Sequence, residues 1–110
     1  MRVTERVVDF INETTLKVVS EEVQHLGKRA ILDTLGVTLA GSGEDSIRIL
    51  LETMGGQQGN SKTSLIGIGL KTDSLSAAMI NGTMAHALDF DDVNDSCMGH
   101  PSAPVLPAVI

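Results

Sequence analysis

The residues best suited to chemistry lie between positions 85 and 102. Two of the three histidines, His86 and His100, flank a stretch in which four of the 14 acidic residues fall within seven positions, 89–95. Histidine titrates near neutral pH, and a neighbouring carboxylate can fix its tautomer and raise its pKa. This combination favours general acid–base chemistry, such as proton transfer next to a carbonyl or carboxylate group.

Three other interpretations of this segment stay open. It can be a solvated acidic loop between two helices. Asp89-x-Asp91 begins like a calcium loop, although Val93 falls where an oxygen ligand belongs. The run 91–95 has the DDxxD spacing that, within a helix, holds Mg²⁺ on a diphosphate. Loop-forming residues surround that run, however, and no lysine or arginine lies nearby in the sequence.

The other residues that could take part in chemistry have ordinary structural explanations. His25 has no companion and is expected to be structural or on the surface, and Cys97 is expected to be an incidental thiol. Phe90 interrupts the acidic stretch and predicts that part of it folds back onto the protein. A single cysteine excludes an internal disulfide and favours a reducing compartment.

The elements that must position these residues are mainly helices. Apolar residues recur at helical spacing, and Ser20, Asp73 or Ser74, and Ser102 are suitable N-caps. Expected helices cover 4–13, 20–41, 45–54, 75–87, and 103 onward.

Glycines add further expectations. Gly27 and Gly36 should lie where another backbone comes close, and Gly41 should end its helix in the left-handed conformation. The apolar run 63–70 is the one credible strand, at an edge or in a hairpin. The fold class is therefore all-α, and the run 63–70 leaves room for one short β-hairpin.

Composition excludes several classes of protein. Eight Lys and Arg against 14 Asp and Glu give a formal charge of −6, so a nucleic-acid partner is not expected. No apolar run approaches the roughly 20 residues of a membrane span, and no partnership with a membrane is expected. The first residues lack the apolar core of a signal peptide, which favours a cytoplasmic protein.

Two motifs carry a family resemblance. His86-Ala87-Leu88-Asp89-Phe90-Asp91-Asp92, followed by the segment 100–108 (HPSAPVLPA), resembles the signature of the MmgE/PrpD family. Upstream, 33–41 and 75–83 are similar to two helices of that family. The resemblance is collinear and covers nearly the whole chain, and the two motifs together are specific.

The resemblance implies a function. The family includes 2-methylcitrate dehydratase, cis-aconitate decarboxylase and iminodisuccinate epimerase, which act on small di- and tricarboxylates without an iron–sulfur cluster. It implies a dehydratase-type lyase (hydro-lyase) with no metal or cofactor, in which His100 and Asp89 are catalytic. Asp92, His86 and Ser102 are assigned to substrate binding. Val93 stands where the decarboxylase branch carries a threonine, which weakens that branch for this chain.

Family members are several times longer than this chain, with a lid domain after the helical domain, and usually form homodimers. Residues 1–110 are therefore expected to be the N-terminal portion of the helical domain, incomplete and inactive alone. The apolar end 107–110 agrees with a chain cut within a domain. The contrasting hypothesis is a non-catalytic helical fragment, interaction module or gene remnant. Which carboxylate is bound, and whether it is dehydrated, decarboxylated or epimerised, stays open.

Overall fold

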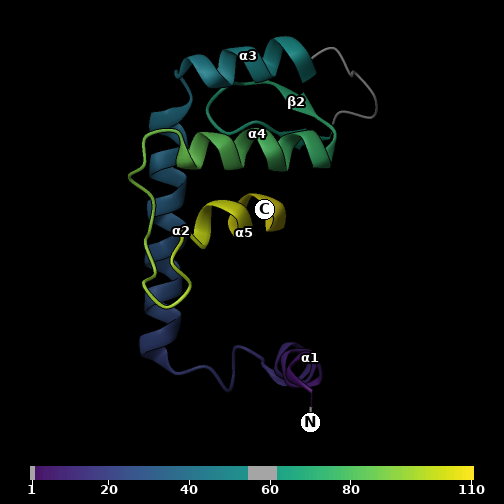
Figure 1. The fold of residues 1–110 in the computed structure, drawn as a ribbon, viewed down its shortest axis with the longest axis vertical. Helices are drawn as coiled ribbons and strands as arrows, with labels where there is room; N and C mark the ends of the chain where they lie inside the picture. Colours follow the sequence, from purple (N-terminus) through teal and green to yellow (C-terminus); the bar gives the residue numbers. More distant parts are fainter. Residues whose placement is uncertain (1, 55–61) are drawn as a thin grey trace.

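The computed structural model describes residues 2–54 and 62–110. It is mostly helical, with one two-stranded antiparallel sheet, as the sequence predicts. Figure 1 shows α2 as a long column from which α3, the hairpin, α4 and α5 extend to one side. The elements in chain order are α1 (Val3–Glu13), α2 (Glu21–Gly41), α3 (Asp45–Met54), β1 (Thr63–Ser64), β2 (Lys71–Thr72), α4 (Ser74–His86) and α5 (Ser102–Val109).

The helix boundaries follow from local chemistry. The Ser20 hydroxyl accepts a hydrogen bond from the backbone N–H of Val23 at 3.3 Å, and two glutamates occupy the first turn of α2. Asp73 caps α4 by accepting from the N–H groups of Leu75 and Ser76. Hydrogen bonding, first to the side chain of Ser76 and then to its backbone N–H, lowers the pKa of Asp73 below its ordinary value of 3.8.

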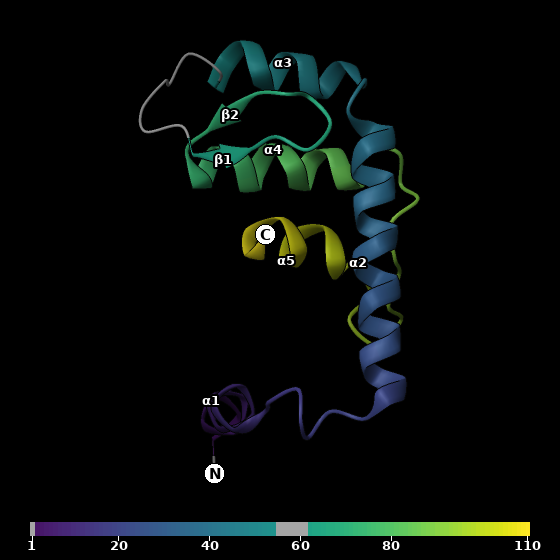
Figure 2. The same ribbon diagram turned by 180° about the vertical axis from the view of Figure 1, so that it is seen from behind.

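The hydrophobic core lies between α3, α4 and the hairpin. Helix α4 packs against α2, α3, α5 and both strands, whereas α1 packs against none of the other elements. Figures 1 and 2 show α1 apart from the rest, beyond the lower end of α2. The buried apolar residues that form the cluster are Ile47, Leu65, Ala77, Ile80 and Met84.

The hairpin differs from the single strand expected over 63–70. Only Thr63 and Ser64 of that run are in β1, paired with β2, and the apolar residues form the turn between the strands. Gly67 and Gly69 take φ of 76° and 75°, which bends the chain there. Asn81 of α4 fixes the hairpin, because its side chain accepts from Ile66 N–H and donates to Ser64 C=O.

The expected roles of three glycines are wrong. A Cβ added at Gly27 or Gly36 would meet nothing within 4 Å, so no backbone comes close there. Gly41 is not left-handed either, and α2 includes it. A Cβ at Gly41 would lie 2.2 Å from the carbonyl oxygen of Met84, so this glycine is where α2 and α4 come close.

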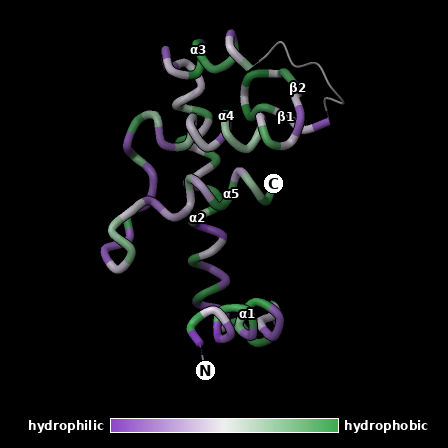
Figure 3. The backbone as a smooth tube through the Cα atoms, turned by 45° about the vertical axis from the view of Figure 1, so that its right-hand side comes forward, coloured by the Kyte–Doolittle hydropathy of each residue, from purple (hydrophilic) through white to green (hydrophobic). Residues whose placement is uncertain are grey.

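Much apolar surface is exposed. Figure 3 shows hydrophobic and hydrophilic residues alternating along α1, and no residue of α1 is buried. Leu26, Leu32 and Leu39 of α2 are also more than half exposed. Within the parts of the chain that the structure describes, no helix is long and apolar enough to cross a membrane.

Candidate active site

The end of α4 and the turn after it place Asp89 next to His86. His86 is the last residue of α4, and Asp89 donates its backbone N–H to the His86 carbonyl at 3.0 Å. Asp89 has φ of 54°, a left-handed conformation that aspartate tolerates better than most residues. The chain therefore turns at Asp89 and leaves the helix axis directly beside His86.

The segment after Asp89 returns to α5 through two anchors. Asn94 pairs with Gly99 as an antiparallel bridge, and the Asn94 side chain accepts from the N–H of Ser96 at 2.9 Å. Asp92 accepts from both the backbone N–H and the hydroxyl of Ser102, at 3.0 and 2.6 Å. Asp92 thus satisfies the start of α5, and these anchors place His100 beside the end of α4.

Ser102 does not cap α5, contrary to the sequence prediction. It is the first residue of the helix, and Pro101 occupies the N-cap position without a side-chain bond. The carboxylate of Asp92 accepts the backbone N–H of Ser102, one of the first N–H groups of α5 that have no partner within the helix. A residue ten positions earlier therefore supplies the cap, which local sequence patterns do not reveal.

Two imidazoles and two carboxylates form one cluster. His86 Nδ1 lies 3.0 and 3.1 Å from the two carboxylate oxygens of Asp91. His100 Nδ1 lies 3.3 Å from Asp91 Oδ1, and His100 Nε2 lies 3.5 Å from Asp89 Oδ1. The two rings meet edge to face with centroids 4.7 Å apart. Protons can therefore pass between these side chains over short distances.

Burial differs sharply within this cluster. The Asp91 side chain is 0% exposed, that of His100 28%, that of His86 53% and that of Asp89 77%. The hydrogen bond and charge of Asp91 raise the pKa of His86 above its usual 6.5, against a smaller lowering by desolvation, and Asp89 adds to the increase. The raised pKa favours a positive charge on His86.

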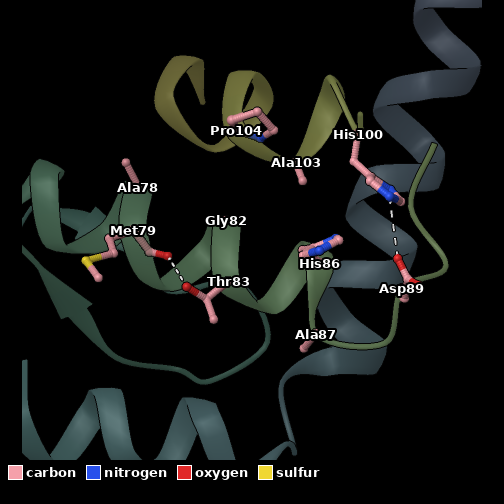
Figure 4. Close-up of a pocket in the computed structure, with 10 residues that line it drawn as sticks. All are labelled: Ala78, Met79, Gly82, Thr83, His86, Ala87, Asp89, His100, Ala103 and Pro104. Carbon is pink, nitrogen blue, oxygen red and sulfur yellow. Dashed lines mark hydrogen bonds and ion pairs between the residues drawn. The ribbon is translucent and has the colours of Figure 1, made fainter. Parts of the chain in front are cut away.

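The cluster closes one end of an open pocket of about 1000 Å³ between α4 and α5. Figure 4 shows His86, His100 and Asp89 at that end, with α5 residues on one side and α4 residues on the other. The size suits a small organic ligand. The lining residues are Ala78, Met79, Gly82, Thr83, His86, Ala87, Asp89, His100, Ala103 and Pro104.

The structure separates the expected site residues into two groups. His100, Asp89 and His86 line the pocket, whereas Asp92 and Ser102 bond to each other and do not line it. Phe90 does not fold back onto the protein as expected, since it is 76% exposed. Asp91 folds inward instead. Asp92, and not Asp91, was assigned to the site from the sequence, and no local signal shows which of these two neighbours faces the imidazoles.

The same geometry bears on cations. One ligand atom from each of His86, Asp89, Asp91 and His100 lies within 4.8 Å of the others, so the group is compact enough to contact one ion. The Nδ1 atoms of both imidazoles, however, lie against Asp91 itself. The DDxxD interpretation also needs a helix, but 91–95 lies outside the described helices, with Asp91 and Asp92 bound to different partners.

Together, fold and site define a helical protein with an imidazole–carboxylate cluster at the end of a pocket. Comparison with known proteins gives the family. The profile of the MmgE/PrpD N-terminal domain matches residues 5–110. The chain belongs to the MmgE/PrpD family, as the resemblance of its motifs predicts.

Among curated proteins, the chain is similar to cis-aconitate decarboxylase of Mus musculus, with 29% identity over 108 residues. The alignment covers 97% of this chain and 22% of the mouse protein. The chain therefore spans about a fifth of the length of that relative. No solved structure matches the chain significantly.

Proposed function

We propose that this chain is part of a lyase that acts on a small di- or tricarboxylate by acid–base chemistry, with His100 and Asp89 as catalytic residues. The observation that carries the proposal is the approach of His100 Nε2 to Asp89 Oδ1, 3.5 Å apart, at the end of the pocket. Membership of the MmgE/PrpD family and the similarity to a decarboxylase support the same class of reaction.

One residue of the pocket, His86, suits an anionic substrate. No lysine or arginine among the described residues lines the pocket, whereas His86 lines it and has a raised pKa. A protonated imidazole can donate a charge-assisted hydrogen bond to a substrate carboxylate. In this proposal His86 binds one carboxylate of the substrate. Substrate binding by Asp92 and Ser102 stays a prediction.

The finer proposal is elimination of water, as in 2-methylcitrate dehydratase. His100 Nε2 takes the proton from the carbon next to a carboxylate, and the electron pair of that C–H bond forms the C=C bond. The C–O bond at the neighbouring carbon breaks, and the leaving hydroxyl takes the proton that His100 removed, so that water leaves and the imidazole is neutral again. Asp89 orients the imidazole and contacts the substrate. Proton transfer by a positioned group of this kind contributes about 10²–10⁴-fold.

Decarboxylation is the second candidate, and the similarity to cis-aconitate decarboxylase favours it. There the bond between a carbon and its carboxylate breaks, CO₂ leaves, and the remaining electron pair takes a proton from His100. The two reactions share the imidazole but differ in products. Incubating the full-length protein with 2-methylcitrate, citrate and cis-aconitate, and identifying products by NMR, separates them. No turnover of any of the three would favour the non-catalytic helical module.

The role of His100 has a matched control in the same chain. His100→Ala in the full-length protein should lower turnover by about 10²-fold or more, because the proton-transfer group is lost. His25→Ala removes an imidazole from an exposed position of α2 and should leave turnover unchanged. Equal turnover in the two variants would remove His100 from the mechanism. Light scattering on the same preparations tests the homodimer that we also propose.

A further inference from the structure

Asp91 is the buried centre of the cluster. Its side chain is 0% exposed, and its oxygens lie 3.0 and 3.1 Å from His86 Nδ1 and 3.3 Å from His100 Nδ1. No other hydrogen bond to its carboxylate exists within the described residues. A carboxylate removed from water needs donors around it, because an unpaired buried charge is strongly destabilising. The imidazole of His86 fills this need, and that of His100 lies close enough to contribute.

An ionised carboxylate only accepts hydrogen bonds, so the imidazole nitrogen facing it must carry the proton. The contact with Asp91 therefore protonates Nδ1 of His86. It leaves Nε2 as the nitrogen free to exchange a proton or contact a ligand. In His100 each nitrogen faces a carboxylate: Nδ1 lies 3.3 Å from Asp91, and Nε2 lies 3.5 Å from Asp89 (Figure 4). Asp91 is buried and Asp89 is largely exposed, so the contact with Asp91 is the stronger one and holds the proton at Nδ1.

The contact with His100 is close but not aligned. His100 Nδ1 is buried and makes no hydrogen bond in the described structure, although Asp91 Oδ1 is only 3.3 Å away. A buried donor without a partner costs about 1–3 kcal/mol. Rotation of the ring about its last torsion, which is soft for histidine, would align the pair. Hydrogen bonds of catalytic groups often tighten in this way when substrate binds.

We propose that Asp91 is a positioning residue: it holds the imidazoles of His86 and His100 side by side, protonated at Nδ1, with their Nε2 atoms left for the pocket. This inference rests on the proposed acid–base function for its effect on turnover. Its structural part, the orientation and protonation of the two rings, stands on the geometry alone.

The neighbouring aspartates give the reason why Asp91 alone has this role. Asp89 is largely exposed at the left-handed turn, and Asp92 is bound to Ser102 of α5. The charged or titratable groups that face His86 are Asp91, Asp89 and His100, and no ion pair among the described residues joins them to α2. Removing the charge of Asp91 therefore removes the main partner of both rings.

The test compares Asp91→Asn with Asp95→Asn in the full-length protein. Both remove one negative charge from the same acidic stretch and keep the side-chain shape, but Asp95 is exposed, and the described ion pairs of the two imidazoles are with Asp89 and Asp91. Histidine titrations are followed by NMR and turnover by substrate assay. Asp91→Asn should lower the pKa of His86 toward about 6.5, lower kcat by about 10- to 10²-fold because His100 loses its orientation, and raise KM because His86 carries less positive charge. Asp95→Asn should change neither.

An unchanged His86 titration in Asp91→Asn would overturn the proposal, whatever the activity. A lowered pKa with full turnover would overturn the positioning role in the reaction. Should Asp91→Asn fail to fold, the nitrogen chemical shifts of the unsubstituted protein decide the matter. Nδ1–H forms of both rings support the proposal, and Nε2–H forms overturn it. Full turnover in His100→Ala would instead refute the proposed function and leave this NMR result standing.

Discussion

The close approach of α2 and α4 at Gly41 predicts that alanine destabilises the protein at Gly41 but stabilises it at Gly36, another glycine of α2. A Cβ at Gly41 would lie 2.2 Å from the Met84 carbonyl oxygen and 3.2 Å from its carbon. An ordinary carbon–oxygen contact is about 3.3–3.6 Å, so α2 and α4 would have to separate by roughly 1 Å. The obstacle is backbone rather than a flexible side chain, and so it cannot rotate away.

The size of the effect follows from two opposing terms. Overpacking of this kind costs typically about 1–3 kcal/mol. Replacing glycine by alanine within a helix returns up to about 1 kcal/mol, and less at the end of a helix, where Gly41 lies. Gly41→Ala should therefore lower the free energy of unfolding by about 1–2 kcal/mol. Gly36→Ala meets nothing within 4 Å and should raise it by about 0.5–1 kcal/mol.

Urea unfolding measures both variants. The chain has no tryptophan or tyrosine, so far-UV circular dichroism, which reports helix content, is the suitable signal. A difference of about 2 kcal/mol between the variants is a factor of about 30 in the unfolding equilibrium. An unchanged slope against urea would show that both variants unfold from the same compact state. Equal stability of Gly41→Ala and Gly36→Ala would refute the close approach of α2 and α4.

Two further predictions concern the site. Because the folded-state pKa of His86 is raised, its ion pair stabilises the protein fully below about pH 6.5, and the stabilisation is lost as the pH rises through the raised value. The unfolding free energy of the unsubstituted protein should exceed that of His86→Gln more at about pH 6 than at about pH 9, and a constant difference would contradict the pairing with Asp91. Asp92→Ala should destabilise the protein by about 1 kcal/mol through loss of the α5 cap. Asp92→Asn should retain most of that stabilisation, because its amide oxygen still accepts a hydrogen bond. Equal unfolding free energies for Asp92→Ala and the unsubstituted protein would contradict the cap.

Much of the helical framework could be predicted from sequence, because its signals are local. Ser20 and Asp73 cap the helices they were expected to cap, and 45–54 is helical as predicted. The family resemblance was likewise carried by contiguous motifs. Side-chain oxygens, first-turn charges and apolar spacing act over a few residues, so a single sequence displays them directly.

What could not be predicted depends on contacts between distant residues. Gly41 was assigned a local role, but its neighbour is Met84, 43 positions later. Phe90 was expected to mark the part of the acidic stretch that folds back, but Asp91 is the buried residue, because His86 and His100 lie against its carboxylate. The cap of α5 comes from Asp92 rather than Ser102 for the same reason. The residue types indicated acid–base chemistry in this region. Tertiary contacts determine that Asp91, rather than Asp92, lies against the imidazoles.

The contact at Gly82 has a consequence for how the pocket could be altered. A Cβ there would lie 3.2 Å from the carbonyl oxygen of Ala103, so the main chains of α4 and α5 nearly touch. Both residues line the pocket, and main chain therefore determines its width at that point. Substrate preference would then be tuned by exchanging Met79, Thr83 or Pro104 within a gap of constant size. Replacing Gly82 by a larger residue would instead push α4 and α5 apart and change the width of the gap between them.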